Sequence, residues 1–104
     1  MDASYQNGLT ALAGGGQTGA TLISRTFTRF TTVATTADSA LLPAASAGLT
    51  YTVKNAGANS MNVFPNVGDA INALSANAAF AVAAGKAAQF FCVVNGTWDA
   101  ILTA

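Results

Sequence analysis

Few residues in this sequence could perform chemistry, and their types limit what that chemistry could be. The acidic residues are four aspartates spread along the chain, Asp2, Asp38, Asp69 and Asp99, and the sequence has no glutamate and no histidine. Two carboxyl groups brought together by folding could hydrolyse a glycosidic bond, but nothing in the spacing singles out a pair. Without histidine, neither a Ser-His-Asp nor a Cys-His arrangement can form. We therefore expect a protein that is not an enzyme.

The single cysteine, Cys92, excludes an intrachain disulfide and a thiolate zinc site. It lies within the apolar run Phe90–Val94, and no Lys, Arg or His is near it in the sequence to activate the thiol. We expect a buried side chain that behaves as a small hydrophobe. The sequence predicts no metal site and no cofactor.

The glycine-rich segment Gly14–Thr21 has the glycines of a phosphate-binding loop but lacks its lysine and its flanking strand and helix. We interpret residues 1–20 as a flexible N-terminal arm that becomes ordered when a partner holds it. Residues 21–104 are expected to form a single β domain. Tyr5, Leu9 and Leu12 are the arm's candidate contacts with a neighbouring subunit.

The composition is apolar and poor in charged residues, and it indicates which classes of partner the protein could bind. The chain has 104 residues, enough for one domain, of which 52% are hydrophobic and only 8% charged; soluble domains carry about 25% charged residues. The formal net charge is zero, so a nucleic-acid partner is not expected. So few charges favour association, and we expect partner subunits to cover much of the surface.

No targeting signal is apparent in the sequence. Residues 1–7 lack the basic and apolar stretches of a signal peptide. No run of apolar residues is long enough for a transmembrane helix. We therefore expect synthesis in a cytoplasm and no membrane partner.

Residues 21–36 are rich in threonine and aromatic residues, which predicts one long strand or two strands joined by a bend. Arg25, Phe27 and Arg29 would share one face of such a strand, which indicates a sheet edge or a subunit contact. Together with Phe30, they complete our set of candidate contact residues.

Regular alternation begins after a predicted loop at residues 37–49. Strands are predicted at residues 50–54, 61–65, 80–82, 88–94 and 97–102. Asn55–Asn59 is predicted to turn the chain back on itself, and Asn95-Gly96 is a strong hairpin signal. Both faces of residues 88–94 are largely apolar, so both are expected to be buried. Short strands separated by turn residues predict an all-β fold, a small antiparallel β-sandwich or jelly-roll-like domain.

Asparagine is frequent in the second half of the chain, at Asn55, Asn59, Asn62, Asn66, Asn72, Asn77 and Asn95. We interpret these residues chiefly as turn formers, because asparagine tolerates left-handed backbone and caps turns. Hydrogen-bonded ladders between copies of the chain and contacts with sugar hydroxyls are the open alternatives. Trp98 is expected in the core or an interface rather than as a sugar-stacking platform.

Several of these segments together resemble a β-rich module of tailed-bacteriophage virion proteins, which include head decoration and fibre proteins. The segments are Leu49–Asn59, Val63–Pro65, Gly68–Asn72, Ala83–Phe90 and Asn95–Trp98. The resemblance covers approximately residues 40–102. It implies a trimeric, β-structured component of the virion.

Among such components, a chain of this length is most similar to a capsid decoration (cement) protein, because a tail fibre normally needs a long shaft. The resemblance then implies a protein on the outer surface of the phage head that binds the major capsid protein and copies of itself and stabilises the assembled head. The alternative is the receptor- or carbohydrate-binding tip of a head or tail fibre, with a host-surface glycan as its partner.

Overall fold

Strands form where threonine, valine and phenylalanine alternate, and glycine- and asparagine-rich turns separate them. The computed structural model describes residues 4–102. Within this range there are ten strands, β1 (Tyr5–Thr10), β2 (Thr21–Leu22), β3 (Phe27–Thr32), β4 (Asp38–Leu41), β5 (Thr50–Asn55), β6 (Met61–Phe64), β7 (Ala70–Ile71), β8 (Phe80–Val82), β9 (Ala87–Val94) and β10 (Thr97–Leu102). In the same residues, no helix has the length and hydropathy of a transmembrane span.

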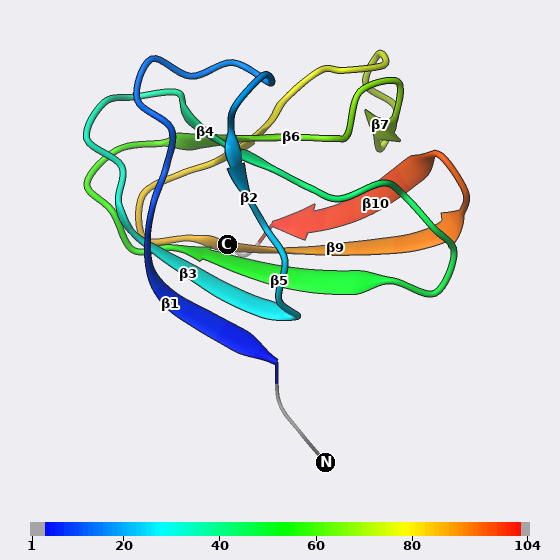
Figure 1. Ribbon diagram of the computed structural model, residues 1–104, viewed down its shortest axis with the longest axis horizontal. Helices are drawn as coiled ribbons and strands as arrows, with labels where there is room; N and C mark the ends of the chain where they lie inside the picture. Colours follow the sequence, from blue (N-terminus) through cyan, green and yellow to red (C-terminus); the bar gives the residue numbers. More distant parts are fainter. Residues whose placement is uncertain (1–3, 103–104) are drawn as a thin grey trace.

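The strands form two sheets that face each other (Figure 1). Sheet A has the order β1-β3-β5-β9-β10-β7, and sheet B has the order β2-β4-β6-β8. From β1 to β6 the chain alternates between the two sheets, so each coil of the chain adds one strand to each sheet. As a result β1, β3 and β5 are parallel, and so are β2, β4 and β6.

The all-β fold class is confirmed, but the arrangement differs from the expected antiparallel, jelly-roll-like sandwich. Parallel strands stacked by a coiling chain make a short β-solenoid. The difference arises at Asn55–Asn59, where the predicted hairpin does not form: β5 lies in sheet A and β6 in sheet B. Alternation predicts a strand but does not say whether the next strand pairs with it or packs across from it.

The C-terminal strands β9 and β10 form an antiparallel hairpin that extends sheet A beyond β5. β9 runs antiparallel to β5, and β10 runs antiparallel to β9. The turn between β9 and β10 is the hairpin predicted at Asn95-Gly96, where Thr97 pairs with Val94. A glycine suits this turn because Gly96 has a φ of 89°.

The described part of the predicted N-terminal arm is paired with the rest of the fold. β1 pairs with β3, and Leu12 exchanges backbone hydrogen bonds of 2.8 and 3.2 Å with Ser39. A Cβ atom on Gly15 would lie 2.6 Å from the carbonyl oxygen of Ala37, so glycine is required at that contact. Residues 1–3 of the arm and residues 103–104 of the β domain lie outside the described residues.

The loop predicted at residues 37–49 contains a strand, β4. Its polar residues Asp38 and Ser39 are buried. Because they break the apolar alternation, the hydropathy pattern does not predict this strand. The carboxylate of Asp38 accepts hydrogen bonds from the backbone amides of Gly14 (3.2 Å) and Thr35 (3.1 Å). The Ser39 hydroxyl donates to the carbonyl of Gly16 at 2.7 Å. These hydrogen bonds come from neighbouring loops and compensate for the burial.

The core lies between the two sheets, and its largest fully buried side chains include Trp98, Phe30 and Phe90. Trp98 meets Tyr51 edge-on, with ring centroids 5.7 Å apart. Cys92 is buried among these residues, as predicted. Since side chains alternate along a strand, a residue next to a core position points to the outer face of its sheet.

Candidate functional site

The outer face of sheet A carries a row of exposed side chains that crosses five strands. The row runs from Tyr5 to Phe27, Thr52, Gln89 and Ile101, each paired with the next across neighbouring strands. Tyr5 is 72% exposed, Phe27 51% and Ile101 58%. Each of these residues flanks an inward-pointing position, so the alternation that fills the core also places these apolar groups in solvent.

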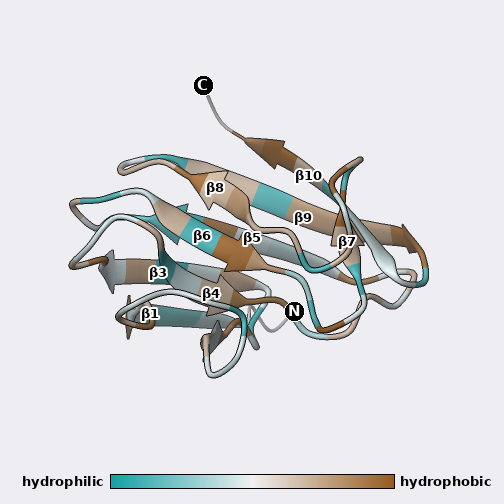
Figure 2. Cartoon of the chain, turned by 90° about the horizontal axis from the view of Figure 1, so that it is seen from above, coloured by the Kyte–Doolittle hydropathy of each residue, from teal (hydrophilic) through white to brown (hydrophobic). Residues whose placement is uncertain are grey.

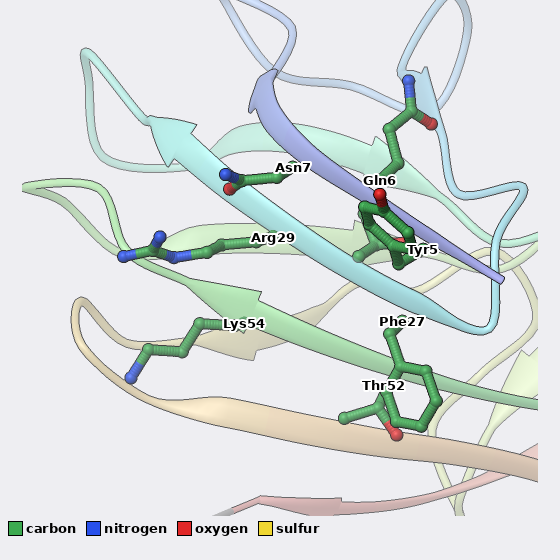
Figure 3. A pocket seen from close by; sticks show the side chains of 8 residues that line it. Tyr5, Gln6, Asn7, Phe27, Arg29, Thr52 and Lys54 are labelled. Atoms are coloured by element: carbon green, nitrogen blue, oxygen red, sulfur yellow. The ribbon is translucent and has the colours of Figure 1, made fainter. Parts of the chain in front are cut away.

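A second row runs beside the first, two residues further along the parallel strands. It comprises Asn7, Arg29 and Lys54, which pair across β1, β3 and β5. The two rows enclose a shallow groove of about 220 Å³, shown in Figure 3. Its lining residues are Tyr5, Gln6, Asn7, Phe27, Thr28, Arg29, Thr52 and Lys54.

The groove has two positive charges side by side and no carboxylate to balance them. Arg29 and Lys54 are direct cross-strand partners, and like charges opposite each other destabilise a sheet. The Lys54 ammonium group donates a 2.6 Å hydrogen bond to the carbonyl of Gly85. Among residues 4–102 no ion pair forms, and the Arg29 guanidinium makes no hydrogen bond. The groove is therefore suited to an anionic group.

Apolar side chains continue toward the ends of β9 and β10, which are coloured brown in Figure 2. Val93, Val94, Ile101 and Leu102 are all exposed. The expectation that both faces of residues 88–94 are buried is therefore wrong for the outer face of the isolated chain. The inner face is buried at Ala88, Phe90 and Cys92 because sheet B covers it, whereas no element of residues 4–102 pairs over the outer face.

The structure brings three of the predicted contact residues together and separates the others. Tyr5, Phe27 and Arg29 line the groove. Arg25 is exposed in the bend that precedes β3 and lies outside the groove.

The remaining predicted contact residues serve the fold. Phe30 is fully buried, so its assignment to a partner contact is corrected to the core: it follows Arg29 on β3 and therefore points inward. Leu9 is half-buried and packs against the core. Leu12 is also half-buried, and its backbone pairs with Ser39 at the edge of β4.

Sequence reasoning missed Gln6, Asn7, Thr28, Thr52 and Lys54 as groove residues. The alternation at residues 50–54 already placed Thr52 and Lys54 on one face of a strand. What it could not supply was the parallel pairing of β1, β3 and β5, which brings residues from three coils side by side.

Two of the three acidic side chains that the structure describes bind backbone amides. Among residues 4–102 no group of three or more His, Cys, Asp and Glu side chains could hold a metal ion. Asp69 accepts a 2.8 Å hydrogen bond from the Ala45 amide, and Asp38 binds two amides as described above. These two carboxylates thus serve to hold loops.

The asparagine side chains confirm the interpretation as turn formers where they bind backbone groups in loops. Asn59 donates to the carbonyl of Val33 at 2.8 Å, and Asn95 accepts from the amide of Ala47 at 2.8 Å. Trp98 is a core residue, as its 0% exposure shows, so its ring is not accessible for stacking on a sugar.

Comparison of the chain with protein-family models, with curated proteins and with solved structures gives no match.

Proposed function

We propose that this chain is a structural virion protein of a tailed bacteriophage, a capsid decoration (cement) protein that binds the outer capsid surface and stabilises the assembled head. The observation that carries the proposal is the pair of neighbouring exposed rings of Tyr5 and Phe27 on the outer face of sheet A. Grouped apolar side chains at a surface are typical of protein interaction sites. The resemblance of residues 40–102 to phage virion modules supplies the virion setting, the major capsid protein as partner, and a trimer as the oligomer.

Such a protein acts through binding alone. A subunit that binds the assembled shell but not its free components stabilises the shell by mass action. Several contacts made by one oligomer reinforce each other through their effective concentration.

The test is binding of the purified chain to capsids of the phage that encodes it, assembled without it. We expect the chain to sediment with the capsids and to raise their resistance to heat. Phe27→Ser should weaken this binding at least about tenfold, the effect of losing roughly 1.4 kcal/mol. The control is Leu74→Ser, which replaces an exposed apolar residue in the loop between β7 and β8 and should leave binding unchanged.

Two results would contradict the proposal. One is a freely soluble monomer with no affinity for the capsids. The other is mass spectrometry of purified virions that finds no copies of the chain beside the major capsid protein.

A second candidate function, the carbohydrate-binding tip of a fibre, is favoured by one feature of the groove. The amide side chain of Asn7 lies on the same face of sheet A as the exposed rings of Tyr5 and Phe27, and rings with an amide suit the faces and hydroxyls of a sugar. A glycan array probed with the isolated chain tests this candidate. Glycan binding that Phe27→Ala abolishes without unfolding, in a chain that does not bind capsids, would replace the decoration proposal.

A further inference from the structure

One edge of sheet A is free to accept another strand. β1 is the first strand of the sheet and pairs only with β3. The Phe27 amide donates to the carbonyl of Ser4 at 3.0 Å, so the alternation of a strand directs the backbone groups of Tyr5 and Asn7 away from the sheet. These groups form a template for pairing with an extended segment.

Two other open strand edges, those of β4 and β10, are partly covered from within the chain. At the edge of β4, Leu12 pairs with Ser39 beside the short strand β2. At the edge of β10, the Asn72 side chain accepts a 2.9 Å hydrogen bond from the Ala100 amide and lies 3.5 Å from the Ala100 carbonyl oxygen, to which it donates. β1 is covered in this way only at its end, where the Thr21 hydroxyl donates to the Thr10 carbonyl at 2.7 Å. The stretch Tyr5–Asn7 has no such cover in residues 4–102, and β1 contains no charged residue or proline, the residues that commonly protect a sheet edge.

A bulge defines which part of β1 can pair regularly. The register shifts between Asn7 and Leu9, and Gly8 has a φ of 83°. Tyr5 to Asn7 is therefore the regular stretch, and it is the stretch that lines the groove.

The positive charges of Arg29 and Lys54 beside β1 favour an added strand that carries acidic side chains. A strand added to β1 would place alternate side chains in line with the Tyr5–Phe27 row and with the Asn7–Arg29–Lys54 row. Two strand spacings, about 9.6 Å, separate the added strand from β3, and a carboxylate side chain and the long Arg29 side chain can meet across that span. A second copy of β1 would bring no acidic group to Arg29 and Lys54, because β1 is uncharged.

We propose that β1 binds an extended acidic segment of a partner polypeptide as an additional strand of sheet A. Its apolar side chains lie over Tyr5 and Phe27, and its carboxylates reach toward Arg29. Main-chain hydrogen bonds supply affinity in this mode of recognition, and alternate side chains supply specificity. The inference rests on the proposed function, which it deepens by naming the chemistry of the partner's segment.

The experiment uses the full chain and a capped peptide of alternating valine and glutamate. Its comparison peptide alternates valine and lysine, and polygalacturonate serves as an acidic carbohydrate probe. Binding is measured by calorimetry, and amide hydrogen exchange is measured by NMR. We expect only the glutamate peptide to bind and to slow exchange of the Tyr5 and Asn7 amides at least about tenfold.

Three variants locate the contact. Arg29→Gln should weaken binding of the glutamate peptide at least about tenfold, because a hydrogen bond to a charged group is lost. Arg25→Gln is the matched control at an exposed arginine outside the groove and should have no effect. Asn7→Pro removes an outward amide at an edge position where proline is tolerated and should abolish binding.

The inference is overturned if neither peptide binds, if both bind equally, if the Tyr5 and Asn7 amides remain unprotected, or if only polygalacturonate binds. It is also overturned if Arg25→Gln weakens binding as much as Arg29→Gln. The capsid assay separates it from the proposed function. Capsid binding that Arg29→Gln leaves unchanged defeats this inference alone, whereas a wild-type chain that does not bind capsids defeats the proposed function.

Discussion

Asn55 is the residue whose replacement should test the fold most directly. It is fully buried at the end of β5, and its side chain makes three hydrogen bonds. Its amide nitrogen donates to the carbonyls of Asn59 (2.8 Å) and Val82 (2.9 Å), and its Oδ1 accepts from the amide of Gly57 (3.0 Å). Because Val82 belongs to β8, this side chain ties sheet A to sheet B.

Replacing Asn55 by alanine removes the side-chain partner of three backbone groups, the buried carbonyl of Val82 and the partly buried carbonyl of Asn59 and amide of Gly57. A net contribution of about 1 kcal/mol for each hydrogen bond, with the cavity and the stranded polar groups added, gives a loss of roughly 3–5 kcal/mol in the free energy of unfolding. That is a large share of the 5–15 kcal/mol typical of a domain. The melting temperature should fall by at least about 12 °C.

Urea unfolding with linear extrapolation measures this loss, and two further variants identify its cause. Asn95→Ala removes one hydrogen bond at an exposed site and should cost less than about 1 kcal/mol. Asn55→Asp keeps the volume but points an oxygen at two carbonyls, so it should be at least as harmful as Asn55→Ala. The reasoning is refuted if Asn55→Ala costs no more than Asn95→Ala, or if Asn55→Asp is as stable as the wild type.

Three further predictions concern backbone strain, close packing and burial. Gly57→Ala should destabilise the fold by about 1–3 kcal/mol in urea unfolding, because its Cβ would lie 2.7 Å from the Val33 nitrogen; an unchanged midpoint would contradict this packing. Ala37→Gly should raise stability by up to about 1 kcal/mol, measured in the same way, because Ala37 has a φ of 76°, and the relief exceeds the entropy cost of glycine. Cys92 should react with a thiol reagent only as the chain opens, so its labelling rate should rise steeply with urea; rapid labelling of the native protein would show that the thiol is accessible.

Local features were predictable from the sequence where one strand and its own turn decide the outcome. The alternation at residues 50–54 and 61–65 corresponds to β5 and β6, and Phe80–Val82 is β8. Asn95-Gly96 forms the β9–β10 hairpin because that turn depends only on the backbone freedom of two residues.

The features that the sequence could not predict depend on residues from different coils. β4 was missed because its buried Asp38 and Ser39 are satisfied by Gly14 and Gly16, more than twenty positions earlier. The parallel pairing of β3 with β5 has no signature in either strand alone, since alternation looks the same in both kinds of sheet.

The candidate site was predictable only in part for the same reason. Tyr5, Phe27 and Arg29 were chosen as contacts from their types and positions, and the fold places them in one groove. Phe30 was chosen with them, but it follows Arg29 on β3, so its side chain points inward and is buried in the core. A one-residue shift of phase separates a core residue from a surface residue in any strand.

Each coil of the chain from β1 to β6 is a structural unit that could be duplicated. A duplicated coil, such as the one from Phe27 to Thr52, could be inserted ahead of β1 and would present the same kind of edge again. Each such insertion would extend the molecule by one strand spacing, about 4.8 Å, and leave the terminal hairpin untouched. Variants with added coils would therefore differ in length along the stacking direction by whole strand spacings, as repeat proteins do.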